Sequence, residues 1–310
     1  MTGPEVVIQD VSVAFGRTEA LRGVNARIVA GAITGLIGRN GAGKSTLLAS
    51  LAAFRKPNAG RITLDGQDPY ENAGLMAATC LIRESGDFAD LNTGQALALV
   101  TSVRSTFSRP YAEELLERFR VPRRRRIDKL SRGQRSAFGA AIGLASRAPL
   151  TLFDEVYLGM DAPTRYAFYD ELLADYAAHP RTIVISSHLI EEVERMFEYV
   201  LVLDEGRVLL NEPADTLRQR GVRVIGDERA VEEFVSGHTV ISRQRLGRTV
   251  AATLFADMGS DLGADAGRRA AAKGLELEHV SIQDLFVHLT SGQAADPPAR
   301  AAEAPSKEPA

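Results

Sequence analysis

The stretch GRNGAGKS, from Gly38 to Ser45, constrains the fold of this chain more than any other part of the sequence. It fits the phosphate-binding pattern G-x-x-x-x-G-K-[ST], with a strand-like run at 32–37 before it and a helix-like run at 45–54 after it. Glycines let the backbone curl around a β-phosphate, a helix N-terminus adds positive charge, and Lys44 reaches the β- and γ-phosphate oxygens. The sequence therefore predicts a nucleotide site in an α/β fold, with Ser45 as a Mg²⁺ ligand. A glycine-rich turn used only for packing would not need a lysine followed by a serine.

Carboxylates and a histidine follow two further strand-like runs. The run LTLFDE at 150–155 ends in Asp154, which is placed to hold the Mg²⁺ shell of a phosphate-binding loop. Glu155 comes next and is suited to orient or deprotonate an attacking water, the alternative being a cap of the following turn. His188 ends the run TIVISSH, at the carboxyl edge of the predicted sheet, where it is placed to hydrogen-bond a γ-phosphate. A structural histidine is the alternative there.

The pentapeptide LSRGQ at 130–134 is a second phosphate-type loop, and it precedes a helical run. Ser131 is predicted to cap that helix, whose first N–H groups then form a second anion site. This loop lies at the end of a helical insertion, whereas the first loop sits on the sheet, so one rigid chain would have difficulty bringing both to one nucleotide. Two copies arranged head to tail solve this, with each 131–133 loop closing over the γ-phosphate held by the other chain.

These motifs together resemble, in order and spacing, the ATP-binding cassette family over about residues 5–211. By that resemblance LSRGQ is the signature motif, 159–161 is the D-loop, His188 is the switch histidine and Glu155 is the catalytic carboxylate of an ATPase. Two sites for ATP and Mg²⁺ then form in a dimer sandwich. The implied metal ligands are Ser45, Glu84 and Asp154. The implied nucleotide contacts are Phe15, Gly38, Arg39, Asn40, Gly41, Ala42, Gly43, Lys44, Ser45, Thr46, Glu84, Ser131, Arg132, Gly133, Gln134 and Asp161.

Several positions depart from the family pattern. Phe15 stands where an aromatic residue, usually tyrosine, stacks on adenine, and a buried core phenylalanine is the alternative. Glu84 occupies the place of the Q-loop glutamine, and its carboxylate is still able to face magnesium or water. Arg132 replaces one of the two signature glycines, and Val156 with Tyr157 replaces the common Pro-Thr pair. The last two changes remove no group that the chemistry needs.

The order of the patterns predicts the domains. An α/β nucleotide-binding cassette with a mixed sheet core is expected over 1–211, with a helical subdomain at about 88–148. A small α+β domain is expected over 212–293, and its predicted order of strand, helix, strand, strand, helix, strand fits a ferredoxin-like fold. The tail at 294–310 is rich in alanine and proline and is expected to be disordered.

Composition limits the partners and the compartment. The formal net charge of −3 gives no global positive field for nucleic acid, so no direct nucleic acid partner is expected. The single Cys80 excludes an internal disulfide and suits a reducing cytoplasm. No stretch approaches the roughly 18 to 20 apolar residues of a membrane-spanning helix, and the first residues do not read as a signal peptide.

Two stretches narrow the family resemblance to one type of cassette subunit. Residues 180–209 and 280–292 are similar to exporter-type cassette subunits of the YtrB-like kind, which work with a separate membrane protein. The resemblance implies an ATP-hydrolysing motor at the inner face of the cell membrane, paired with a second copy or a homologous ATPase and with a transmembrane permease. The alternative is a soluble cassette ATPase acting on DNA or ribosomes, which usually carries a long coiled coil or tandem cassettes. A small-molecule kinase would leave LSRGQ unexplained.

Overall fold

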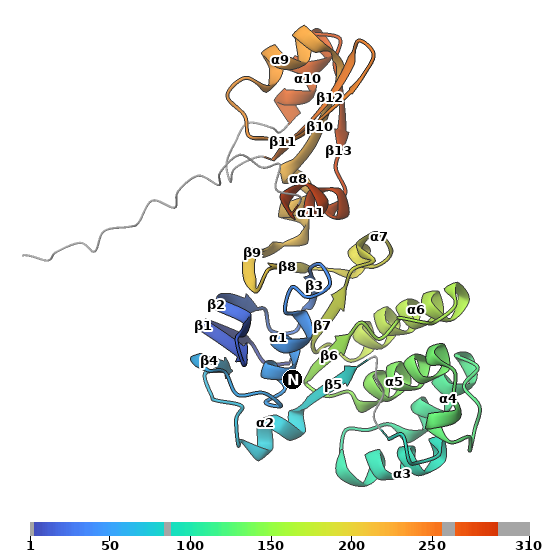
Figure 1. Ribbon diagram of the computed structural model, residues 1–310. Coiled ribbons are helices and arrows are strands. Elements are labelled where there is room, and N and C mark those ends of the chain that lie inside the picture. Colours follow the sequence, from blue (N-terminus) through green and yellow to red (C-terminus); the bar gives the residue numbers. More distant parts are fainter. Residues whose placement is uncertain (1–2, 84–87, 256–263, 291–310) are drawn as a thin grey trace, which may run out of the picture. The chain divides into compact units, whose positions relative to one another are not determined.

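The computed structural model describes residues 3–83, 88–255 and 264–290 of the 310-residue chain. The chain divides into two compact units, Met1–Thr216 and Leu217–Ala310. The labels of Figure 1 are used for the helices and strands of both units. In the described part of the chain, no helix combines the length and the apolar character needed to cross a bilayer.

A six-stranded sheet forms the centre of the first unit. Its first five strands are parallel, and β9 pairs antiparallel with β8 through a turn at Glu205 and Gly206. Strands β3, β6 and β7 are buried throughout, which is typical of parallel strands covered on both faces and explains their continuous apolar runs. In sheet order the strands are β5 (Thr79–Arg83), β6 (Leu150–Asp154), β7 (Thr182–Ser187), β3 (Ile33–Ile37), β8 (Tyr199–Asp204) and β9 (Arg207–Pro213).

A smaller antiparallel sheet shares its core with the parallel one. It has the order β2 (Thr18–Ile28), β1 (Val6–Phe15) and β4 (Ala59–Leu64). Helix α1 (Lys44–Leu51) buries Leu47, Leu48 and Leu51 in a cluster that also holds Val6 of β1 and Leu36 of β3. The helix that follows the phosphate loop is therefore anchored to both sheets.

Helices fill the connections of the parallel sheet, and Figure 1 shows α3, α4, α5 and α6 grouped together beside it. The sequence predicts one helix over 191–198, but the structure has the short α7 and then a 3-10 turn at Glu194–Met196. Phe197 is extended and buried, and its ring fills the space over β3 where Gly35 has no side chain. A continued helix would carry Phe197 away from that space. The helices are α2 (Ala73–Ala78), α3 (Thr93–Val103), α4 (Arg109–Arg118), α5 (Arg132–Ser146), α6 (Ala162–Ala178) and α7 (Ile190–Val193).

The second unit contains an antiparallel sheet with the strand order β11-β12-β10-β13. Its core joins Val224 of β10 and Leu254 of β12 to Val231 and Phe234 of α9 and Ala270 of α10. The succession β-α-β-β-α-β is that of ferredoxin-like folds. The elements are β10 (Gly221–Asp227), α9 (Glu228–Val235), β11 (Val240–Leu246), β12 (Thr249–Phe255), α10 (Ala264–Ala272), β13 (Glu276–His279) and α11 (Ile282–Thr290).

The passage between the two units differs from the predicted boundary. Strand β9 continues to Pro213, beyond the predicted end of the first domain at Asn211. Helix α8 (Ala214–Arg220) then spans the division after Thr216. The strand continues because its last residues stay paired with the start of β8, with Pro213 opposite Tyr199. The predicted disordered tail lies outside the described residues.

Candidate functional site

The loop between β3 and α1 has the backbone that a phosphate-binding loop requires. Gly41 and Gly43 have φ angles of 85° and 104°, a left-handed region that favours glycine. Gly43 caps α1 without a side-chain hydrogen bond, so no side chain of the cap occupies the first N–H groups of the helix. The turn between β8 and β9 supports the loop, because the N–H of Gly206 donates to the carbonyl of Ala42 over 3.0 Å.

Lys44 is buried beneath this loop. Its Nζ donates to the carbonyl oxygens of Gly38 at 2.8 Å and Arg39 at 3.2 Å, and it lies 3.1 Å from Oε1 of Glu155. An ammonium group has three hydrogens, so these three acceptors match it completely. A pocket of about 270 Å³ opens here, and its lining residues are Ala20, Asn40, Gly41, Gly43, Lys44, Ser45, Thr46 and Glu155.

Strand register brings the predicted carboxylates to the same edge of the sheet. Asp154 of β6 lies opposite Ser186 of β7, and Ser187 lies opposite the end of β3 at Ile37. The Ser186 hydroxyl donates to Oδ1 of Asp154 over 2.8 Å and accepts from the N–H of Glu155 over 2.9 Å. One serine therefore fixes both members of the carboxylate pair.

Glu155 connects the phosphate loop to His188. Its φ of 49° lies in the left-handed region, which a residue with a side chain rarely adopts. One carboxylate oxygen contacts Lys44, and the other lies 3.2 Å from Nδ1 of His188. A glutamate that only caps the following turn would leave these two contacts unexplained.

The signature loop and the D-loop meet at a second pocket. Ser131 caps α5 as the sequence predicts, with Gln134 N–H donating to its Oγ and the Gln134 side chain accepting from the N–H of Ser131, each over 3.2 Å. Asp161 caps α6 by accepting from the N–H of Thr164 over 3.0 Å, and hydrogen bonding by Thr164 lowers the pKa of Asp161. Both caps line a pocket of about 270 Å³, together with Phe119, Arg120, Gly133, Gln134, Ala137, Gly159, Met160 and Thr164.

Close backbone packing joins these two loops. A side chain on Gly133 would collide with the carbonyl of Gly159, which itself has a φ of 79°. The hydroxyl of Ser136 in α5 donates to the carbonyl of Leu158 over 2.6 Å. The signature helix is thus fixed against the turn that begins at Glu155.

The remaining predicted site residues belong to two separate pockets, lie on the surface or fall outside the described residues. In the described part of the chain, the pocket at Lys44 and the pocket at Ser131 share no lining residue. Phe15 is 51% exposed and stacks under the Arg55 guanidinium at 4.3 Å, so it is not a core residue. Arg39 and Arg132 are exposed. Glu84 lies outside the described residues.

Sequence reasoning missed two residues that organise the site. Ser186 is a buried strand residue, and only its register with Asp154 reveals its role. Tyr157 is fully buried, and its hydroxyl lies 3.0 Å from Oγ of Ser187. The available signal was the tyrosine itself, which is a large polar residue where the resembled family has a small one.

Comparisons with known proteins agree on one family. The family model described as ABC transporter matches residues 21–157. The ABC transporter ATP-binding protein YtrB of Bacillus subtilis (strain 168) is 26% identical over 220 residues, covering 71% of this chain and 75% of YtrB. AlbC of the same organism, an inferred ABC transporter ATP-binding protein, is 33% identical over 238 residues, covering 71% of this chain and 98% of AlbC. The daunorubicin resistance ATP-binding protein DrrA3 of Streptomyces coeruleorubidus is 27% identical over 310 residues, covering 94% of this chain and 97% of DrrA3.

Solved structures show the same fold. An ATP-binding subunit of an ABC transporter superposes with a TM-score of 0.61 at 23% identity, covering 69% of this chain and 92% of that one. A bacterial Atm1-family ABC exporter with ATP bound superposes with a TM-score of 0.60 at 26% identity, covering 70% of this chain and 40% of that one. The predicted cassette fold, with its mixed sheet core, is confirmed.

The close contact between Gly133 and Gly159 predicts that alanine destabilises the cassette at Gly133 but not at Gly94. Gly133→Ala is expected to lower the melting temperature of the cassette by several degrees, since overpacking against a backbone carbonyl costs about 1–3 kcal/mol. Gly94→Ala is the matched control, because Gly94 is also the second residue of a helix with a capping box, and a Cβ there meets only the Asn92 side chain at 3.4 Å. Differential scanning calorimetry of both variants measures the effect. Equal melting temperatures would contradict the packing described.

Proposed function

The chain belongs to the ATP-binding cassette (ABC) transporter family, and from that premise we propose that it is the motor subunit of an ABC exporter. ATP-binding subunits of this family are ATPases that couple hydrolysis to transport, form dimers and work with a transmembrane partner. The observation that carries the proposal is the position of Glu155, whose carboxylate contacts both Lys44 and His188.

The residues at the edge of the sheet fit ATP together with Mg²⁺. Lys44 and the first N–H groups of α1 are suited to the β- and γ-phosphates. Ser45 and Asp154 would hold the ion, and Ser186 fixes the Asp154 carboxylate. Glu84 is proposed as a further ligand from its place in the sequence. The ion would neutralise charge on the transferred phosphoryl group.

Glu155 and His188 supply the reactive groups. Phosphate oxygens compete with Glu155 for the Lys44 ammonium, so ATP binding releases one carboxylate oxygen to orient and deprotonate water. His188 then donates to the γ-phosphate from the neighbouring strand end. Phe15, which is exposed, is proposed to stack on adenine.

The second pocket, at Ser131, is the reason to propose that two chains form a dimer. Ser131, Gly133 and Gln134 present a helix N-terminus that faces a pocket apart from Lys44. We propose that a head-to-tail second copy, or a homologous subunit, brings this surface onto the γ-phosphate held by the first chain. Each site is then completed by Arg132 and Asp161 of the opposite subunit.

One relative favours export over import, because its likeness extends beyond the cassette. Relatives named for sulfate/thiosulfate import (CysA of Caulobacter vibrioides) and methionine import (MetN of Corynebacterium jeikeium) align with 66% and 67% of this chain. The resistance protein DrrA3 aligns with 94%, a share that has to include residues of the second unit. The proposed transmembrane partner is a separate polypeptide, which would hold this subunit at the inner face of the membrane. Action on DNA or ribosomes is not favoured, because these relatives are named as transport or resistance proteins.

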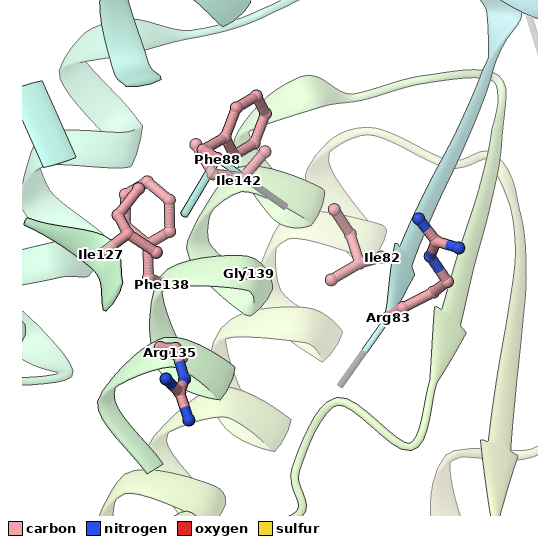
Figure 2. Close-up of a pocket in the computed structure, with 8 residues that line it drawn as sticks. All are labelled: Ile82, Arg83, Phe88, Ile127, Arg135, Phe138, Gly139 and Ile142. Carbon is pink, nitrogen blue, oxygen red and sulfur yellow. The ribbon is translucent and has the colours of Figure 1, made fainter. Parts of the chain in front are cut away.

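A hollow between α5 and β5 is the proposed contact for that partner. Figure 2 shows its apolar side chains with the guanidinium groups of Arg83 and Arg135 beside them. The hollow itself is small, so the proposed contact is made at its rim, where the Arg135 guanidinium matches an acidic residue of the partner. The lining residues are Ile82, Arg83, Phe88, Ile127, Arg135, Phe138, Gly139 and Ile142.

Removal of the proposed general base tests the catalytic assignment. Glu155→Gln is expected to bind ATP as tightly as the wild type and to lower turnover at least 100-fold, because an amide does not accept the proton of water. Gel filtration with ATP and Mg²⁺ is expected to show an accumulated dimer. Wild-type turnover in this variant would remove Glu155 from the role.

A mixing experiment tests whether sites are shared. Lys44→Ala is expected to weaken nucleotide binding because it removes the phosphate-binding cation, and Ser131→Arg is expected to block the signature surface. Each variant alone is inactive, whereas a mixture assembles some dimers with one intact site. Phosphate release by the mixture, compared with each variant at the same total concentration, measures the recovery. No recovery at any ratio would argue against sites formed between two chains.

A charge reversal in the hollow tests the partner surface. Arg135→Glu is expected to reduce copurification with the membrane fraction at least fivefold, because it repels an acidic partner segment, while ATP affinity stays unchanged. Arg109→Glu is the matched control, since Arg109 is an exposed arginine of the helical region and does not line the hollow. Equal recovery of both variants from membranes would place the partner elsewhere.

A further inference from the structure

Tyr157 lies two residues after Glu155 and is completely buried. Its hydroxyl lies 3.0 Å from Oγ of Ser187 and accepts from the main-chain N–H of His188 over 3.1 Å. The same hydroxyl lies 3.5 Å from Nδ1 of His188, and the two rings are tilted with centroids 6.1 Å apart. One phenol therefore contacts the backbone and the side chain of the residue that follows β7.

The hydroxyl is held in its neutral form. Burial raises the pKa of Tyr157, so the phenol keeps its hydrogen. Its oxygen accepts from the His188 N–H, and its single hydrogen is left for Ser187 Oγ, because Nδ1 of His188 faces the Glu155 carboxylate, which only accepts. Ser187 Oγ also accepts from the N–H of Leu189 over 3.0 Å. These bonds fix the backbone where β7 ends and α7 begins.

Tyr157 also belongs to the turn that carries Glu155. The N–H of Leu158 donates to the Glu155 carbonyl over 3.0 Å, and Ser136 of α5 holds the Leu158 carbonyl. The turn of Glu155 is thus joined to His188 itself by two routes, besides the bond from the Glu155 N–H to Ser186. One is the direct contact between the carboxylate and the imidazole, and the other passes through the Tyr157 hydroxyl.

We propose that Tyr157 is a positioning residue for ATP hydrolysis, and that its hydroxyl holds His188 in place against Glu155. The inference rests on the proposed function, because it requires that Glu155 and His188 act in hydrolysis. It concerns a position where this chain differs from the usual Pro-Thr pair of the resembled family. A reacting group fixed by a second contact loses less orientation during each turnover.

Tyr157→Phe in the full chain tests the proposal, because it keeps the ring and removes the hydroxyl. The kcat for ATP hydrolysis is expected to fall about tenfold, while the KM for ATP stays within about twofold, as when one positioning hydrogen bond is lost. Tyr111→Phe is the control, since it removes a tyrosine hydroxyl that donates to Glu171 in the helical region. Its kcat is expected to equal that of the wild type. A wild-type kcat in folded Tyr157→Phe would overturn the proposal and leave the proposed function standing.

A double-mutant cycle separates positioning from a general loss of packing. If Tyr157 acts through His188, Tyr157→Phe lowers the kcat of a His188→Ala chain no further. A second tenfold loss in the double variant would overturn the proposal. Full turnover by His188→Ala alone would overturn both the positioning role and the assignment of His188 in the proposed function.

A second variant keeps the test decisive if Tyr157→Phe does not fold. Ser187→Ala removes the other partner of the hydroxyl and leaves the tyrosine in place. It is expected to lower kcat at unchanged KM, because the phenol then loses Ser187 Oγ and is held at the strand end through His188 alone. An unchanged kcat in this variant would overturn the proposal.

Discussion

The buried ammonium group of Lys44 is the interaction on which the rest of the site depends. A buried cation is stable only when its hydrogens are matched, and here they meet two loop carbonyls and the carboxylate of Glu155. The carbonyls fix the curl of the phosphate loop, and the carboxylate ties that loop to the end of β6. Because β7 lies between β3 and β6, this contact spans the strand that carries Ser186 and Ser187 and ends just before His188.

The parallel sheet makes that convergence possible. Lys44, Glu155 and His188 are far apart in the sequence, but each follows the carboxyl end of a strand in one continuous block. Such strand ends are where open α/β sheets bind ligands. The register then sets the finer detail, because the pairing of Asp154 with Ser186 places one hydroxyl between the two carboxylate residues.

Interactions between residues that are close in the sequence could be predicted, whereas those between distant residues could not. The phosphate loop and the Ser131 cap could be predicted because their partners lie within a few residues, at spacings that the motifs show. Ser186 and Tyr157 could not, since their partners belong to another strand and only the register between β6 and β7 brings them together. The division of the helix after Val193 likewise depends on Phe197 filling the space over the distant Gly35.

The turn from Glu155 to Asp161 is a physical link between the pocket at Lys44 and the pocket at Ser131. Its first residue lines the pocket at Lys44, whereas Gly159, Met160 and Asp161 line the pocket at Ser131. Collision of any Gly133 side chain with Gly159 shows how closely the turn meets the signature helix. A shift of Glu155 on phosphate binding would therefore move residues at the Ser131 surface, which is proposed to face a second chain. Since interfaces and packed cores switch between discrete arrangements, such a turn is suited to link nucleotide binding in one half of a dimer to closure of the other.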